Sequence, residues 1–174
     1  MLTTRAVENY RSLRRLVMPL AALTVVTGAN GTGKSSLYRA LRLLADSARN
    51  GAVASLAREG GLSSTLWAGP DTIGREVRDG RQPVQGTARG GPIRLCLGFV
   101  SDDLGYAMDL GLPVRGSSAF NLDPEIKCEA VWSGPVLRSS ALLSDRRGPL
   151  VRTRDGRTAA RRTAAPGRSR RLRT

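Results

Sequence analysis

The chain has 174 residues, of which 40% are hydrophobic, and this is enough for about one domain with a buried core. It contains no histidine, so histidine-based catalysis and most zinc sites are excluded. The formal net charge of +14 is unevenly distributed, because the segment from Arg152 to Thr174 carries nine arginines and one acid, a net of +8, and leaves +6 for the rest.

The N-terminal 27 residues predict two or three short strands. Leu2–Glu8 is the first, Arg15–Leu20 could be the second, and the apolar stretch Leu23–Thr27 is the last. A helix is expected over Lys34–Ala48, because apolar residues recur there at helical spacing (Leu37, Leu41, Leu44 and Ala48). Asn50-Gly51 is a good signal for its end, and a shorter helix over 52–59 is expected to stop at Gly60-Gly61.

A complete phosphate-binding loop lies between the predicted strand and the predicted helix. The glycines allow the backbone to wrap a polyphosphate, and the start of the helix adds its positive dipole end. Lys34 is expected to place its charge at the β- and γ-phosphates, and the Ser35 hydroxyl to ligate Mg²⁺. The sequence therefore predicts binding of Mg²⁺-ATP or a related nucleotide by Gly28, Ala29, Asn30, Gly31, Thr32, Gly33, Lys34, Ser35 and Ser36.

The hydrophobic period changes in the second half of the chain. Residues 69–92 show no periodicity and are expected to be a loop or a disordered insertion. Apolar residues then alternate with polar ones over 93–99, 106–112 and 126–132, which predicts three antiparallel strands with one face on a core. In the third strand the inward set is expected to be Ile126, Cys128, Ala130 and Trp132, opposite Glu125, Lys127 and Glu129.

The end of the chain predicts little packed structure. Residues 141–151 could hold one more strand, and Asp155-Gly156 could turn a hairpin. The segment beyond is too poor in apolar residues to offset its chain entropy. The expected organisation is a phosphate-loop ATPase domain over 1–151, with an antiparallel β-subdomain over 93–132, and a basic disordered tail over 152–174.

No targeting or membrane segment is evident from the sequence. No apolar run approaches the roughly 18 residues of a membrane span, and Glu8 and Arg11 interrupt the N-terminus, unlike a signal peptide. Cys96 and Cys128 lie in strand-like stretches and are expected to be buried, reduced thiols. These features predict a cytoplasmic protein.

Two stretches carry a resemblance to a known family. Val7-Glu8-Asn9-Tyr10-Arg11-Ser12-Leu13, followed by the stretch Leu23–Leu37 that contains the phosphate loop, resembles the N-terminus of RecF/SMC-like AAA-family ATPases, which are ABC-type ATPase heads. The resemblance implies an α/β fold of the P-loop NTPase class with an antiparallel β-subdomain. It also implies ATP and Mg²⁺ as ligands, a head-to-head dimer, and a role in DNA repair or chromosome maintenance. In the family, the equivalents of Asn30 and Arg11 lie close to the phosphates.

Other parts of the family's pattern are not found. The signature motif, the apolar strand ending in Asp-Glu and the switch histidine have no convincing counterpart, and the chain is expected to be the N-terminal part of such a head. Leu97–Asp103 looks superficially like the acidic strand end, but a hairpin turn explains Asp102 and Asp103 better. Gln82 and Gln85 are the two candidates for the family's metal-contacting glutamine, and neither is assigned. No catalytic residue is therefore assigned.

Two other functions remain open at this point. The length would suit a small nucleotide or metabolite kinase, although the antiparallel strands after the phosphate loop disfavour it. A basic protein without catalytic activity that binds nucleic acid through the arginines of 152–174 is the other alternative.

Overall fold

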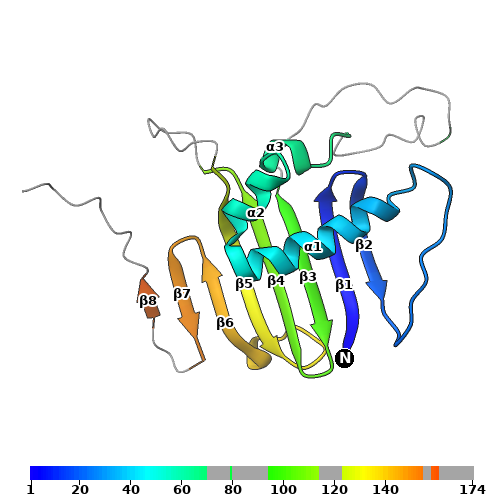
Figure 1. Cartoon of the computed structure of the whole chain (residues 1–174). Helices are drawn as coiled ribbons and strands as arrows, with labels where there is room; N and C mark the ends of the chain where they lie inside the picture. Colours follow the sequence, from blue (N-terminus) through cyan, green and yellow to red (C-terminus); the bar gives the residue numbers. More distant parts are fainter. Residues whose placement is uncertain (70–78, 80–93, 114–122, 155–157, 161–174) are drawn as a thin grey trace, which may run out of the picture.

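One antiparallel sheet and three helices make up the part of the protein that the computed structural model describes, which is residues 1–69, 79, 94–113, 123–154 and 158–160 (Figure 1). The sheet has eight strands in the order β2-β1-β3-β4-β5-β6-β7-β8. Their bounds are β1 Leu2–Tyr10, β2 Leu13–Pro19, β3 Leu95–Ser101, β4 Leu104–Gly111, β5 Glu125–Ser133, β6 Leu142–Arg147, β7 Leu150–Thr153 and β8 Thr158–Ala160. A short 3-10 helix, η1 Ser139–Ala141, precedes β6.

The helices lie on one face of this sheet. Helix α1 (Lys34–Asn50) crosses the central strands, and α2 (Ala52–Arg58) and α3 (Leu62–Thr65) follow near one end of them (Figure 1). Gly51, with φ +81°, separates α1 from α2. The core lies between the helices and the sheet, because an amphipathic helix and a one-sided sheet must bury their apolar faces together. Its members include Val7, Tyr10, Leu43, Leu44, Leu56, Leu95, Leu97, Met108 and Leu110.

Most of the expected elements are confirmed. The helix expected over 34–48 is α1, the one over 52–59 is α2, and the three alternating segments are β3, β4 and β5, all antiparallel. The buried side of α1 is Leu37, Ala40, Leu43 and Leu44. Asp102 and Asp103 form the turn between β3 and β4, as expected of a hairpin.

The sheet is larger than the sequence predicted. The N-terminal hairpin joins it directly, because β1 pairs with β3 in a register that places Val7 opposite Leu97. The strand that 141–151 could hold is present as β6, and β7 follows it as the second strand of a hairpin. The expected domain boundary at residue 151 falls inside β7, and β8 pairs with β7 beyond it. The expected Asp155-Gly156 turn, most of the loop over 69–92 and the tail from 161 on lie outside the described residues.

The prediction of a strand at Leu23–Thr27 is wrong. The segment leads from β2 to the phosphate loop without strand structure, and Leu23 and Val25 are 81% and 73% exposed. A strand needs a neighbour for its backbone hydrogen bonds, and no strand among the described residues pairs with these five. The apolar side chains of this segment are therefore exposed on the surface.

A β-bulge changes which side of β5 faces the helices. The register between β4 and β5 shifts at Asp109/Leu110, so that Ile126 lies opposite Leu110 and Glu129 lies opposite Met108. One extra residue in a strand moves every later side chain to the other face. Ile126, Glu129 and Val131 consequently line the helix side, whereas Trp132 packs on Gly105. The prediction that Cys128 and Ala130 face the core is therefore wrong, whereas Trp132 is buried as expected, at 6% exposure, but on the opposite face of the sheet.

Gly98 allows β3 and β4 to lie close together. A Cβ at this position would be 2.8 Å from the backbone oxygen of Tyr106, which cannot move without its strand. We expect Gly98→Ala to lower the free energy of unfolding by about 1–3 kcal/mol, measured by urea denaturation. Gly111→Ala is the matched control, because its Cβ would first meet the flexible side chain of Lys127 at 3.2 Å. Equal stability of the two variants would contradict the close approach of the strands.

Candidate functional site

The phosphate loop ends where α1 begins, and its glycines hold conformations that other residues rarely adopt. Gly28, Gly31 and Gly33 have φ of +153°, +84° and +96°, and Lys34 is the first residue of α1. A Cβ on Gly33 would lie 3.1 Å from Leu13 Cδ2 and 3.2 Å from Ser12 Oγ. A Cβ on Gly28 would lie 2.9 Å from Thr32 Oγ1. At Gly28 and Gly33 glycine is favoured by both backbone conformation and space, and at Gly31 by backbone conformation alone.

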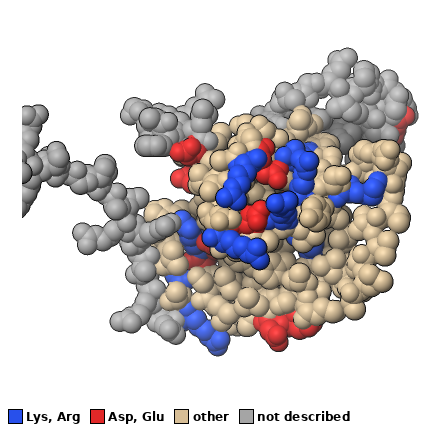
Figure 2. Space-filling view, viewed as in Figure 1, with Lys and Arg blue, Asp and Glu red and all other residues tan. Residues whose placement is uncertain are grey.

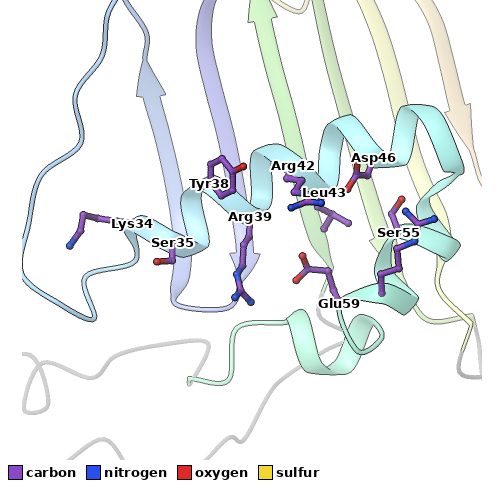
Figure 3. A pocket seen from close by; sticks show the side chains of 10 residues that line it. Lys34, Ser35, Tyr38, Arg39, Arg42, Leu43, Asp46, Ser55 and Glu59 are labelled. Carbon is purple, nitrogen blue, oxygen red and sulfur yellow. Dashed lines mark ion pairs between the residues drawn. The ribbon is translucent and has the colours of Figure 1, made fainter.

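Lys34 spans this loop. Its ammonium donates hydrogen bonds to the carbonyl oxygens of Gly28 (2.6 Å) and Ala29 (2.7 Å), and Thr32 Oγ1 donates to the same Ala29 oxygen (2.9 Å). In Figure 3 the Lys34 side chain extends away from the other labelled side chains at the first turn of α1. Asn30 is exposed in the same loop. The positive charge is thus held at the helix N-terminus, where unpaired N–H groups and the helix dipole also favour an anion.

The turn between β1 and β2 is joined to this loop. Ser12 Oγ lies 2.8 Å from Ser36 Oγ within hydrogen-bonding distance, and Leu13 lies against Gly33. Asn9 and Arg11 have φ of +60° and +50°, the left-handed region in which residues other than glycine are strained. The two strained residues lie on either side of Tyr10, which is fully buried. The turn therefore acts as a fixed support beneath the phosphate loop.

Arg11 is engaged with α2 in this structure. Its guanidinium forms an ion pair with Glu59, donates from Nε to the Tyr10 hydroxyl (3.3 Å), and lies 5.6 Å from the centre of the Tyr10 ring. Tyr10 also donates to Glu59 Oε2 at 3.0 Å. The hydrogen bond to Glu59 raises the pKa of Arg11, and burial raises the pKa of Tyr10. The closeness of Arg11 to bound phosphates stays a prediction.

A groove of about 750 Å³ runs from the start of α1 to α2 (Figure 3). Lys34 and Ser35 lie at one end of it, and Glu59 contributes a carboxylate from the far wall. On this face of the molecule, basic side chains gather over α1 and α2 with acidic ones between them (Figure 2). The basic residues that line the groove are Lys34, Arg39, Arg42 and Arg58. Their charge favours a polyanion beside the phosphate loop.

The arginines of this groove were not among the predicted site residues. Arg39 and Arg42 lie three residues apart on α1, between the apolar positions, and this spacing puts them on one side of a helix. That signal was present in the sequence. The position of Arg58 depends on how α2 packs against α1, which no local pattern encodes.

The acidic residues near the groove are already paired. Glu59 is bound by Arg11, and Asp46 lies 3.6 Å from the Arg42 guanidinium. Asp102 lies in the β3–β4 turn, paired with the amino group of Met1, and neither it nor Asp103 lines the groove. Gln82 and Gln85 lie outside the described residues.

A magnesium ion would have few protein ligands here. Within the described ranges no three His, Cys, Asp or Glu side chains gather as a metal site, and Cys96 and Cys128 are free thiols. Mg²⁺ beside a nucleotide commonly takes one or two protein ligands, together with phosphate oxygens and waters. Ser35, which lines the groove next to Lys34, fits that arrangement.

Comparison with known protein families agrees with this geometry. Residues 1–127, which include the phosphate loop, all three helices and β1 to β4, match the AAA ATPase domain. The chain belongs to the AAA ATPase domain family. Its members are ATP-binding domains. The resemblance of the sequence to an AAA-family ATPase is therefore confirmed.

No curated protein and no solved structure matches this AAA ATPase domain. In the part of the chain that the structure covers, no helix is long and apolar enough to cross a membrane.

The Tyr10–Arg11–Glu59 cluster should contribute measurably to stability. Glu59→Gln removes the charge that Arg11 pairs with, while both side chains remain largely buried, at 28% and 19% exposure. We expect the free energy of unfolding to fall by about 1.5–3 kcal/mol, measured by urea denaturation. Asp46→Asn is the control, because its Arg42 partner is 68% exposed and such pairs contribute about 0–1 kcal/mol. A smaller loss for Glu59→Gln than for Asp46→Asn would contradict this assignment.

Proposed function

We propose that this AAA ATPase domain binds Mg²⁺-ATP through residues 28–36. The observation that carries the proposal is the geometry of the loop, in which three left-handed glycines and Lys34 surround the N-terminus of α1. The groove next to it is lined by four basic side chains and is large enough for a nucleotide. A phosphate chain entering the loop would replace the carbonyl oxygens of Gly28 and Ala29 as the partner of Lys34.

Three side chains and the backbone of the loop would contact the nucleotide. Lys34 carries the charge toward the β- and γ-phosphates, and the backbone N–H groups of the loop bind the phosphate oxygens. Ser35 supplies a hydroxyl ligand to Mg²⁺. Asn30, exposed in the loop, approaches the phosphates from the solvent side.

We further propose that the domain is of the RecF/SMC-like class and has the fold of an ABC-type ATPase head. The support is the Asn9–Ser12 turn, whose last residue contacts Ser36 of the phosphate loop. The antiparallel sheet that packs on α1 agrees with the β-subdomain expected of such heads. A link to DNA repair or chromosome maintenance, a head-to-head dimer and DNA binding through the arginine-rich tail remain part of this proposal.

Replacing Lys34 tests the proposed ATP site. We expect Lys34→Ala to weaken Mg²⁺-ATP binding about tenfold or more, because a charge-assisted hydrogen bond contributes about 1.5–3 kcal/mol. Lys127→Ala is the matched control, because Lys127 is the other lysine of the chain and pairs with Glu125 on β5. Ser35→Ala should remove the gain in affinity that Mg²⁺ gives. Calorimetry that finds equal affinity for wild type and Lys34→Ala would refute the site.

The purified chain should hydrolyse ATP barely above background. Hydrolysis needs a positioned water and a free carboxylate or equivalent group, and both acids that line the groove are held by arginines. Phosphate release by wild type and by Asp102→Asn should be equally slow. Rapid turnover that Asp102→Asn abolishes would show that the β3–β4 turn carries a catalytic acid.

A further inference from the structure

A second cavity, of about 620 Å³, lies between α1 and the sheet. Leu41 and Leu44 of α1 form one wall, and Phe99, Met108 and Val131 of the sheet form the other. The residues of α1 that line it are not those that line the groove at Lys34, which include Ser35, Tyr38, Arg42 and Asp46. The two sites therefore lie on different sides of the same helix. The volume of this second cavity is in the range of small-molecule sites, which are mostly apolar with a few polar groups.

Arg5 is the polar group that dominates this cavity. It is 1% exposed and lines the cavity from β1. Its Nε and Nη2 atoms are buried and have no hydrogen-bond partner among the described residues, and burial lowers the pKa of Arg5 to about 10. Ser47 Oγ, on the α1 side of the cavity, is also buried without a partner there. Buried charges and donors left unpaired are costly, so a ligand that supplies an anionic acceptor would be stabilised.

The other charged groups that face the cavity do not neutralise Arg5. Glu129 lines the cavity from β5, but its Oε1 accepts a hydrogen bond from the Tyr106 hydroxyl (2.7 Å) and its Oε2 lies 3.6 Å from Arg146 Nη1. No ion pair joins Glu129 to Arg5 within 4.0 Å. The described residues therefore leave one unneutralised positive charge in an apolar space.

We propose that this cavity binds a small amphipathic monocarboxylate, whose carboxylate pairs with the Arg5 guanidinium and whose apolar body lies on Leu44, Phe99 and Met108. A guanidinium presents a planar fork of donors that matches a carboxylate. The cavity has one cation and apolar walls. It therefore suits a ligand with a single negative charge on an aliphatic or aromatic body better than it suits a polyphosphate. This site is separate from the proposed ATP site and does not depend on it.

Calorimetry on the full chain with decanoate and with decanol tests the charge requirement. The two probes share the alkyl chain and differ in the carboxylate, and we expect decanoate to bind at least about tenfold more tightly. Arg5→Leu should reduce decanoate affinity to that of decanol, and Arg5→Lys should restore part of the difference. Arg15→Leu, which removes an exposed arginine of β2, is the control and should bind as wild type does.

A stability measurement separates loss of the site from loss of the fold. Replacing an unpaired buried charge by a residue of similar apolar volume is often neutral or stabilising, so Arg5→Leu should unfold at a Tm no lower than that of wild type. Equal affinity of wild type for both probes, or unchanged decanoate binding by Arg5→Leu, would overturn the proposal. A wild-type dimer that Arg5→Leu dissociates would assign the cavity to a second copy of the chain and also overturn it.

Discussion

The part-buried contact between Tyr10 and Glu59 is the constraint on which the other parts of the site depend. Tyr10 is at the end of β1 and Glu59 follows α2, so one hydrogen bond joins β1 to the helical layer. Arg11, in the turn between β1 and β2, forms an ion pair with the same Glu59 carboxylate. The phosphate loop lies on the far side of that turn, with Leu13 and Ser12 against Gly33. The loop is thereby positioned by packing in the sheet and not by its own residues alone.

The backbone of the turn has a conformational cost that the surrounding contacts offset. Left-handed residues other than glycine cost about 1–3 kcal/mol each, and Asn9 and Arg11 are two such residues. The Arg11 N–H donates to the Thr65 carbonyl (2.7 Å), the Asn9 carbonyl accepts from Trp67 N–H (3.1 Å), and Asn9 Nδ2 donates to the Arg94 carbonyl (3.0 Å). Strained backbone persists where neighbouring structure over-determines it, which is common at binding sites. The segment that follows α2 consequently holds the turn that contacts the phosphate loop.

The sequence predicted what depends on local pattern and missed what depends on distant neighbours. Glycine spacing predicted the phosphate loop, and helical periodicity predicted α1. In the structure α1 begins at Lys34, as expected. Leu23–Thr27 looked like a strand because its composition is strand-like, but a strand forms only beside another. The inward orientation of Glu129 depends on a bulge at Asp109/Leu110 that alternation alone cannot reveal. Arg5 falls in the same class, since its burial arises from packing between α1 and the sheet.

The exposure of Leu23, Val25 and Val26 has a consequence for the behaviour of the protein at high concentration. No charged residue lies between Leu20 and Lys34, so nothing in this stretch repels an identical stretch of another molecule. Apolar, β-prone segments with free backbone hydrogen-bonding groups tend to pair edge to edge and to nucleate aggregates. The same residues lead directly into the phosphate loop. Nucleotide held in the loop would fix one end of the segment and so oppose its self-association.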